Sequence, residues 1–336
     1  MHLKCSFSRM EDISMLRHRV LIRLSLILTL TACIMMTGCN VDGRSVTINK
    51  YTFEFVTGAH EDYVIRGGDF SLTAGQMRLL LSGVRDGYEA ALTSNIWDMQ
   101  LDDVSFGEYV DDTVLDMSVR LMIVNMLAAD KRIELGTAEL SDSMESADAF
   151  YDEHEPELTY VSREEVETLF EMMRLSDKVY NELGKNVDTE ISMDEARVIR
   201  IQYIYSKDSM QKLYDAVAEY EEGAAFSSLA AKYSDSTEYT AEIGRGEMDK
   251  NFENTAFNLD EGQISSVISC NNGFYLIYCV NDNVEDKIDS QKERIVQNRQ
   301  KEQFENFFNE FSKNVVLSFD KNAWDRITAQ LKQGEQ

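Results

Sequence analysis

The chain has 336 residues, of which 43% are hydrophobic, and its formal net charge is -27 at pH 7. This length suits about two domains, and the hydrophobic content excludes a chain that is disordered throughout. The charge excludes nucleic acid as a partner, because phosphate contacts need clustered lysines and arginines. The last of the four histidines is His154, so the second half of the chain cannot use histidine chemistry or form His-Cys zinc sites.

The start of the chain has the pattern of a targeting signal. A positive leader contains Arg17, Arg19 and Arg23. The apolar run LSLILTLTACIMM follows and is shorter than the roughly 20 residues of a transmembrane helix. It leads into Met36-Thr37-Gly38-Cys39, which resembles the lipobox of bacterial lipoproteins. The resemblance implies a signal peptide over 1–38 and a lipid on the sulfur of Cys39; an ordinary signal peptide and a membrane anchor are the alternatives.

Residues 39–195 have mainly helical periodicity and predict an N-terminal helical domain. Short strands are expected at 52–56 and 63–66. Helices are then expected at 73–92, 105–129, 138–153 and from 162 to 184. The last helix begins with Ser162-Arg163-Glu164-Glu165, a capping box in which Ser and Glu side chains satisfy the first backbone N–H groups. Apolar residues spread around the helix at 105–129, so we expect it at the centre of the domain.

Near residue 195 the pattern changes to the alternation of a strand in RVIRIQYIY, 197–205. Alternation places Ile201, Tyr203 and Tyr205 on one face of this strand. Helices at 209–221 and 226–233, a helical turn near 252–257 and a hairpin over 264–280 follow. These elements predict a β-α-α-α-β-β domain of the α+β class over 196–285.

After residue 285 the helical pattern returns, followed by a short strand at 315–319 and a helix around Trp324. This segment, 286–336, has too little apolar surface to fold alone. We therefore expect it to pack on the N-terminal domain, which makes the α+β domain an insertion. Cys270 and Cys279 flank the predicted hairpin turn in a register that does not favour a disulfide between them.

Residues 198–285 resemble a parvulin-type peptidyl-prolyl isomerase domain. Four stretches carry most of the resemblance, in chain order: VIRIQYIYSKD, GAAFSSLAAKYSDS, EIGRGEM and NGFYLIYCV. With the lipobox and the helical flanks, the chain resembles the PrsA-type foldase lipoproteins of Gram-positive bacteria. The fold class that this implies is α+β, with a chaperone-like helical domain and an inserted parvulin-like domain.

The resemblance also implies the site. The family carries histidines where this chain has Tyr203 and Tyr275, and Ser236 stands where a cysteine or aspartate is common. These three residues are the candidate catalytic residues. The candidate substrate-binding residues are Ile243, Met248, Phe252 and Asn272, the first three as an apolar seat for a proline ring. Phenols donate and accept hydrogen bonds as imidazoles do, but they lack a pKa near 6.5, so we expect weak or absent isomerase activity.

The resemblance implies an extracytoplasmic foldase, anchored by a lipid on Cys39 to the outer face of the cell membrane. Its expected partners are unfolded or proline-containing secreted polypeptides, with no cofactor and no metal, and a homodimer is allowed. The alternative is a non-catalytic chaperone or peptide-binding lipoprotein that uses a degenerate parvulin domain. A transporter's substrate-binding lipoprotein is disfavoured, because repeated βαβ patterns are not seen.

Overall fold

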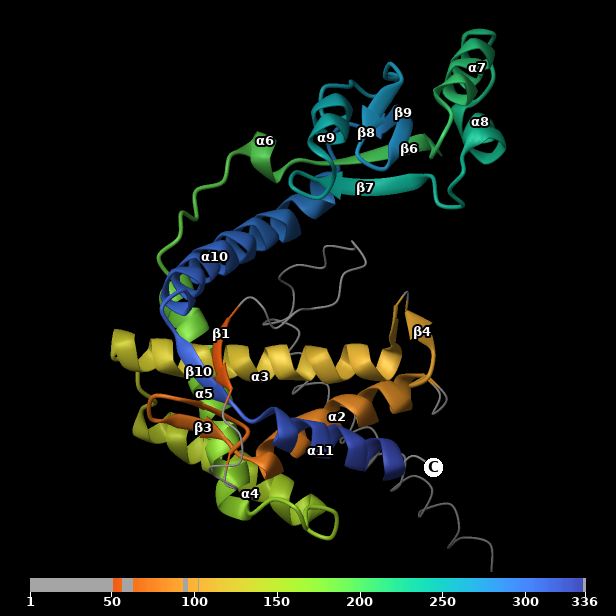
Figure 1. Ribbon diagram of the computed structural model, residues 1–336. Coiled ribbons are helices and arrows are strands. Elements are labelled where there is room, and N and C mark those ends of the chain that lie inside the picture. The colour runs from red at the N-terminus through yellow and green to blue at the C-terminus, as the bar shows by residue number, and fades with distance from the viewer. Residues whose placement is uncertain (1–50, 56–62, 93–95, 102, 335–336) are drawn as a thin grey trace, which may run out of the picture. The chain divides into compact units, whose positions relative to one another are not determined.

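The computed structural model (Figure 1) describes residues 51–55, 63–92, 96–101 and 103–334. The predicted signal peptide and Cys39 lie outside these residues. The chain divides into two compact units. The first contains the chain up to Lys185 together with the part from Gln303 onward, and the second is Asn186–Glu302. The second unit is therefore an insertion in the sequence of the first.

The first unit combines helices with a mixed sheet. Its helices are α2 (Ala74–Ala91), α3 (Phe106–Lys131), α4 (Thr137–His154), α5 (Arg163–Gly184) and α11 (Lys321–Gly334). Its sheet has the order β1-β10-β2-β3, with β1 (Thr52–Phe55) parallel to β10 (Val316–Phe319) and antiparallel pairing to β2 (Ile65–Gly67) and β3 (Phe70–Leu72). The predicted helices are confirmed, as are the strands predicted at 52–56, 63–66 and 315–319, whereas β3 was not predicted. A small hairpin of β4 (Gln100–Leu101) and β5 (Val104–Ser105) was not predicted.

Helix α3 is the centre of the first unit, as its broad apolar distribution predicts. It packs against α2 and α5, and most of its middle is buried. The fully buried Asn125 of α3 donates hydrogen bonds from Nδ2 to the carbonyl oxygen of Met172 and to Ser176 Oγ on α5, at 3.1 and 3.0 Å. A buried amide needs such partners, so these bonds fix how α3 packs against α5.

The second unit is built on an antiparallel sheet with the order β7-β6-β9-β8. Its elements in chain order are α6 (Met193–Ala196), β6 (Val198–Ser206), α7 (Met210–Glu221), α8 (Phe226–Tyr233), β7 (Thr240–Gly244), α9 (Lys250–Ala256), β8 (Ile268–Cys270), β9 (Gly273–Asn281) and the start of α10 (Ile288–Ser312). The α+β class is confirmed. Strand β7 corrects the predicted β-α-α-α-β-β order, because the sequence TAEIG was taken for a loop.

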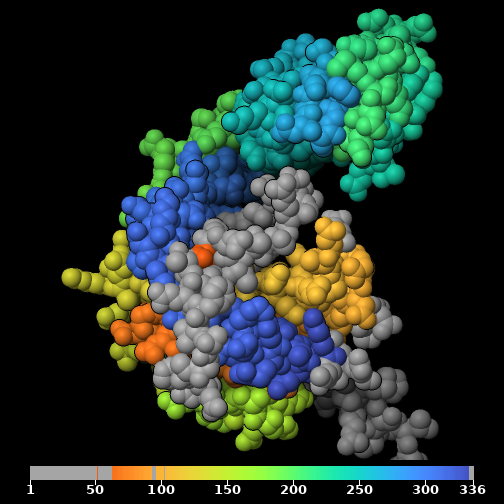
Figure 2. Space-filling model, in the orientation of Figure 1, coloured from red at the N-terminus to blue at the C-terminus, as the bar shows by residue number. Residues whose placement is uncertain are grey.

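The sheet of the second unit has a different helical cover on each face. Phe252 and Ala256 of α9 pack on the face of β6 that carries Ile199 and Ile201. Helices α7 and α8 pack on the other face, where Ile204 of β6 is buried. In the space-filling view the green surface of α7 and α8 lies beside the blue surface of the β8–β9 hairpin (Figure 2). Alternate side chains of β6 therefore belong to two separate apolar clusters, one on each face of the sheet.

The compact second unit is longer than the domain predicted over 196–285. It also includes 186–195 and 286–302. Arg299 of α10 explains part of this extension, because its guanidinium donates to the carbonyl oxygens of Asp188 and Glu190 and pairs with Glu195. Helix α10 is continuous from Ile288 to Ser312, so the returning segment begins within one helix rather than at a loop. Within the described ranges, no helix has the length and apolar content needed to cross a bilayer.

Candidate functional site

The candidate site lies on the sheet of the second unit, on the face that α9 covers in part. Strands β6 and β9 run antiparallel, with Tyr205 opposite Tyr275 and Tyr203 opposite Ile277. Because side chains alternate along a strand, this register places Tyr203, Tyr205 and Tyr275 on one face. The sequence predicted this face for the β6 residues.

The three tyrosines and Phe252 form a compact aromatic group, which we call the aromatic face. The ring centroids of Tyr203 and Tyr275 are 5.9 Å apart, and those of Tyr205 and Tyr275 are 5.0 Å apart. Phe252, which is 1% exposed, stands nearly perpendicular to Tyr275 at 5.1 Å and to Tyr203 at 6.2 Å. Edge-to-face contacts at these distances favour a fixed arrangement of the rings.

Hydrogen bonds fix two of the three hydroxyl groups on the aromatic face. The Nδ2 group of Asn272 lies 3.0 Å from Tyr275 Oη, and Tyr275 Oη lies 3.2 Å from Asn272 Oδ1. Tyr205 Oη donates to the main-chain carbonyl oxygen of Asn272 at 2.8 Å. Burial raises the pKa of Tyr275, and its contact with Asn272 acts in the opposite direction. Tyr275 is therefore a neutral phenol near pH 7.

The residues predicted as an apolar seat are placed differently from one another. Ile243, at the end of β7, is 3% exposed and belongs to the same apolar cluster as Phe252. Met248 is 36% exposed, and its main-chain N–H donates to Glu253 Oε1 of α9. An exposed thioether is suited to a flexible apolar contact with a ligand.

Ser236 belongs to a turn rather than to the aromatic face. Its Oγ donates to the carbonyl oxygen of Glu238 at 2.7 Å and accepts from the N–H of the same residue at 3.2 Å. The adjacent Asp235, which the sequence did not single out, accepts from Ser206 Oγ and the N–H of Lys207. The pKa of Asp235 is lowered most by its hydrogen bond from Lys212 and next by the hydrogen bond from the Lys207 N–H. The stretch therefore ties a loop to the end of β6.

Both cysteines in the second unit are free thiols. Cys270 packs partly against the aromatic cluster, and burial, followed by the charge of Asp249, raises its pKa to about 11. Burial likewise raises the pKa of Cys279 to about 11. Thiols with such pKa values are poor nucleophiles near pH 7. No group of three or more metal-binding side chains occurs among the residues that the structure describes.

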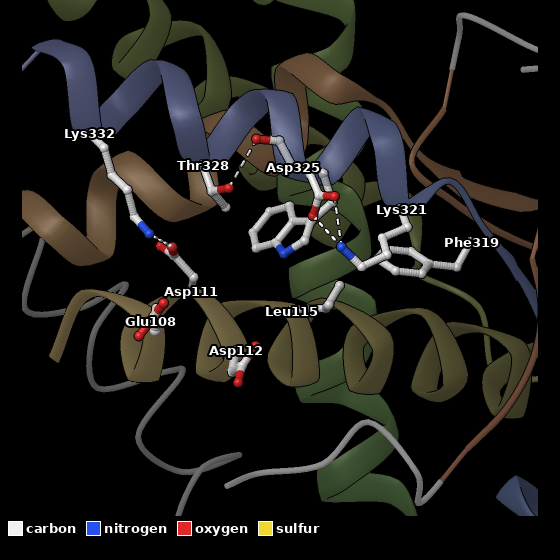
Figure 3. Close-up of a pocket in the computed structure, with 10 residues that line it drawn as sticks. Glu108, Asp111, Asp112, Leu115, Phe319, Lys321, Asp325, Thr328 and Lys332 are labelled. Atoms are coloured by element: carbon white, nitrogen blue, oxygen red, sulfur yellow. Dashed lines mark hydrogen bonds and ion pairs between the residues drawn. The ribbon is translucent and has the colours of Figure 1, made fainter. Parts of the chain in front are cut away.

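A groove in the first unit lies between α3 and α11 (Figure 3). It encloses about 210 Å³ and is lined by Leu115, Phe319 and Trp324 together with charged residues. Most of the charges compensate one another: Lys321 pairs with Asp325 at 2.7 Å, and Asp111 pairs with the buried Arg85 at 2.8 Å. Glu108 and Asp112 add further carboxylates to this lining, and its apolar part consists of three side chains. The aromatic face gathers more apolar surface and is the better candidate site.

The second unit has the strands and helices that the sequence analysis expected of a parvulin-type domain, with strand β7 in addition. Residues 202–282 match the family model described as Rotamase: PPIC-type PPIASE domain. This part of the chain is a parvulin-type peptidyl-prolyl isomerase domain, as the sequence predicted.

Three solved structures are similar to this chain over different shares of its length. The chain is similar to the peptidylprolyl isomerase PrsA from Bacillus cereus, at 19% identity and a TM-score of 0.41 over 71% of this chain and 92% of that one. PrsA from Bacillus anthracis is 18% identical, with a TM-score of 0.40 over 66% of this chain and 96% of that one. NmPin, the parvulin of Nitrosopumilus maritimus, matches at 22% identity and a TM-score of 0.23, over 25% of this chain and 95% of that one. No curated protein matches the chain.

Proposed function

We propose that the chain is an extracytoplasmic foldase, anchored to the cell membrane by a lipid on Cys39, whose parvulin-type domain binds and slowly isomerises prolyl peptides. The observation that carries the proposal is the aromatic face, where Tyr203 and Tyr275 stand 5.9 Å apart beside Phe252. In this proposal the two phenols occupy the places of the family's histidines. Ile243, Met248 and Phe252 provide the apolar seat for the proline ring.

Such a site needs no proton transfer and no covalent bond to be effective. Rotation about an X-Pro bond is limited by the loss of amide conjugation, with a barrier near 18–20 kcal/mol. A pocket accelerates the rotation when it binds the twisted amide better than the planar one. An apolar seat that holds the proline ring while leaving the preceding residue free to turn meets this requirement. Without imidazoles we expect only weak acceleration.

The proposed chaperone role rests on the organisation of the chain. A leader with a lipobox, a helical unit interrupted by a parvulin-type insertion, and a returning helix suit a protein that works on secreted polypeptides at a membrane surface. The net charge of -27 repels anionic lipid surfaces, so attachment would depend on acyl chains rather than on basic residues.

The alternative is a non-catalytic peptide-binding or chaperone lipoprotein. Two observations favour it. Ser236 uses its hydroxyl within its own turn, and Tyr275 uses its hydroxyl on Asn272, so neither of these two candidate catalytic groups is free to act on a substrate. In this alternative the aromatic face holds proline-containing segments without changing their isomer.

NMR exchange spectroscopy on a tetrapeptide with one proline separates the two functions. The purified full-length chain, added in amounts comparable to the peptide, should raise the cis–trans exchange rate above the uncatalysed rate. Suppression of the aggregation of an unfolded client, measured by light scattering, tests the chaperone role in the same preparation. Suppression without faster exchange would favour the non-catalytic alternative, and failure of both assays would reject the proposed function.

A further inference from the structure

The three tyrosines of the aromatic face differ in the state of their hydroxyl groups. Tyr205 and Tyr275 both bond to Asn272, one to its main-chain carbonyl oxygen and the other to its side chain. Tyr203 Oη has no hydrogen-bond partner among the residues that the structure describes. The Tyr203 ring is nevertheless partly buried, because it packs against both Phe252 and Tyr275. A phenol held in this way has a free donor at a fixed position.

We propose that the Tyr203 hydroxyl is the hydrogen-bond donor that the site presents to the prolyl peptide, and that Asn272 is a positioning residue that holds Tyr275 in place. This inference rests on the proposed function and assigns different roles to residues of the site. The sequence assigned Tyr203 and Tyr275 equivalent roles and placed Asn272 among the substrate contacts. The geometry instead makes Tyr203 the residue that contacts substrate and Asn272 part of its support.

Amide chemistry explains how one free phenol would help. When an X-Pro bond twists, the nitrogen loses conjugation with the carbonyl group, and its lone pair becomes a better hydrogen-bond acceptor. A donor beside the nitrogen therefore binds the twisted amide more strongly than the planar one, which lowers the barrier. The apolar surroundings of Tyr203 strengthen such a bond relative to one in water. No proton is transferred in this step.

The turn that carries Asn272 has little freedom to move. Gly273 follows Asn272 with a φ of 145°, a backbone conformation that favours glycine. A Cβ at Gly273 would lie 2.7 Å from the carbonyl oxygen of Ser206 and 2.8 Å from the Tyr205 ring. The turn therefore lies directly against the end of β6. This close approach sets the position of the Asn272 carbonyl and amide groups to which Tyr205 and Tyr275 bond.

The direct test compares Tyr203→Phe with Tyr278→Phe in the full-length chain. Tyr278 also lies on β9, but it packs on the opposite face of the sheet, against Phe226. Loss of one neutral hydrogen bond should lower the catalysed exchange rate of the proline tetrapeptide about threefold to tenfold in Tyr203→Phe. Tyr278→Phe should keep the wild-type rate. Equal thermal midpoints would show that both variants fold.

The outcomes separate this inference from the proposed function. Equal exchange rates for Tyr203→Phe and the wild type would overturn the role of Tyr203 while leaving isomerase activity intact. If the wild-type chain does not accelerate exchange, the isomerase proposal fails, and a peptide titration decides about Tyr203. Weaker peptide binding by Tyr203→Phe than by the wild type would then support it. Unchanged affinity, or no binding by the wild type, would overturn it.

The positioning role of Asn272 has its own readout. Asn272→Ala removes the side-chain contact with Tyr275 but leaves the main-chain acceptor of Tyr205 in place. We expect the pKa of Tyr275, followed through its ¹³Cζ resonance, to rise, because the Asn272 contact lowers it. The exchange rate should fall at the same time. Asn271→Ala, in the same turn, should change neither quantity, and an unchanged Tyr275 resonance in Asn272→Ala would overturn the positioning role.

Discussion

Asp177 of α5 is a carboxyl group whose ionisation the fold opposes. Burial raises its pKa from 3.8 to about 6, and the charge of Arg174 offsets only part of this effect. Because the pKa is higher in the folded chain than in the unfolded chain, the folded state holds its proton more tightly. Stability from this group is present below pH 3.8 and is lost as the pH rises through about 6. Near pH 8 the fold contains an unfavourable charge.

Asp177→Asn should therefore stabilise the protein in a pH-dependent way. At about pH 8 the free energy of unfolding should rise by up to about 3 kcal/mol, and below about pH 4 it should change little. Urea unfolding at both pH values measures the difference. Asp142→Asn, on the exposed face of α4, is the control, because it removes the same charge as Asp177→Asn. An equal gain for Asp177→Asn at both pH values would contradict the explanation.

At the level of single residues, periodicity predicts faces but not hydrogen-bond partners. Alternation along β6 was sufficient to place Tyr203 and Tyr205 together. That Tyr275 joins them depends on the register of β9, which the turn at Asn272 sets. The bond of Ser236 to Glu238 depends on loop geometry, which has no periodic signature in the sequence. These contacts therefore required the structure.

At the level of elements, helix α2 contains a glycine that its packing requires and another that it does not. A Cβ at Gly75 would lie 2.7 Å from the carbonyl oxygen of Tyr160 and 3.2 Å from the Cα atom of Val161, both backbone atoms. A Cβ at Gly83 would meet nothing within 4 Å. The same substitution should therefore have opposite effects at the two positions.

Gly75→Ala should destabilise the chain by about 1–3 kcal/mol, because the backbone at Tyr160 must move away. Gly83→Ala should stabilise it by up to about 1 kcal/mol through higher helix propensity. Thermal unfolding of the two variants beside the wild type measures both effects. If Gly75→Ala is as stable as Gly83→Ala, α2 does not approach residues 160–161 as closely as the structure indicates.

The elements that the sequence predicted well carry strong local signals. The capping box of Ser162 and Glu165 begins α5 as expected. Glu165 also accepts a hydrogen bond from the hydroxyl of Thr73, the N-cap residue of α2. Strand β7 was missed because it has five residues, lies at the edge of the sheet and ends at a glycine. Its pairing with β6 is a long-range contact that a short sequence window does not reveal.

At the level of the whole molecule, the sequence predicted an insertion but not its boundaries along the chain. The change of periodicity near residue 195 marks the start of β6, whereas the second unit begins at Asn186. Arg299 holds the connecting segment through main-chain carbonyl groups, and any sequence supplies such groups. Helix α10 has residues in both units without a break in its pattern, so its sequence carries no boundary signal.

Membrane attachment is a property of the whole chain that one substitution tests. Cells that express the chain and grow with a labelled fatty acid should incorporate the label into the wild type. Cys39→Ala should lose the label and appear in the medium or the soluble fraction, since the proposed anchor depends on that sulfur. Cys270→Ala, which alters a free thiol in the second unit, should keep the label. A labelled Cys39→Ala chain would contradict lipidation at this residue.

Prolyl peptides should bind at the aromatic face of the second unit. Titration of the isotope-labelled full-length chain with the proline tetrapeptide, followed by NMR, tests it most directly. We predict that resonances of Tyr203, Met248 and Phe252 shift with the peptide, while those of Phe226 and Tyr278 on the opposite face of the sheet do not. Shifts confined to the face covered by α7 and α8, or no shifts at all, would contradict the claim.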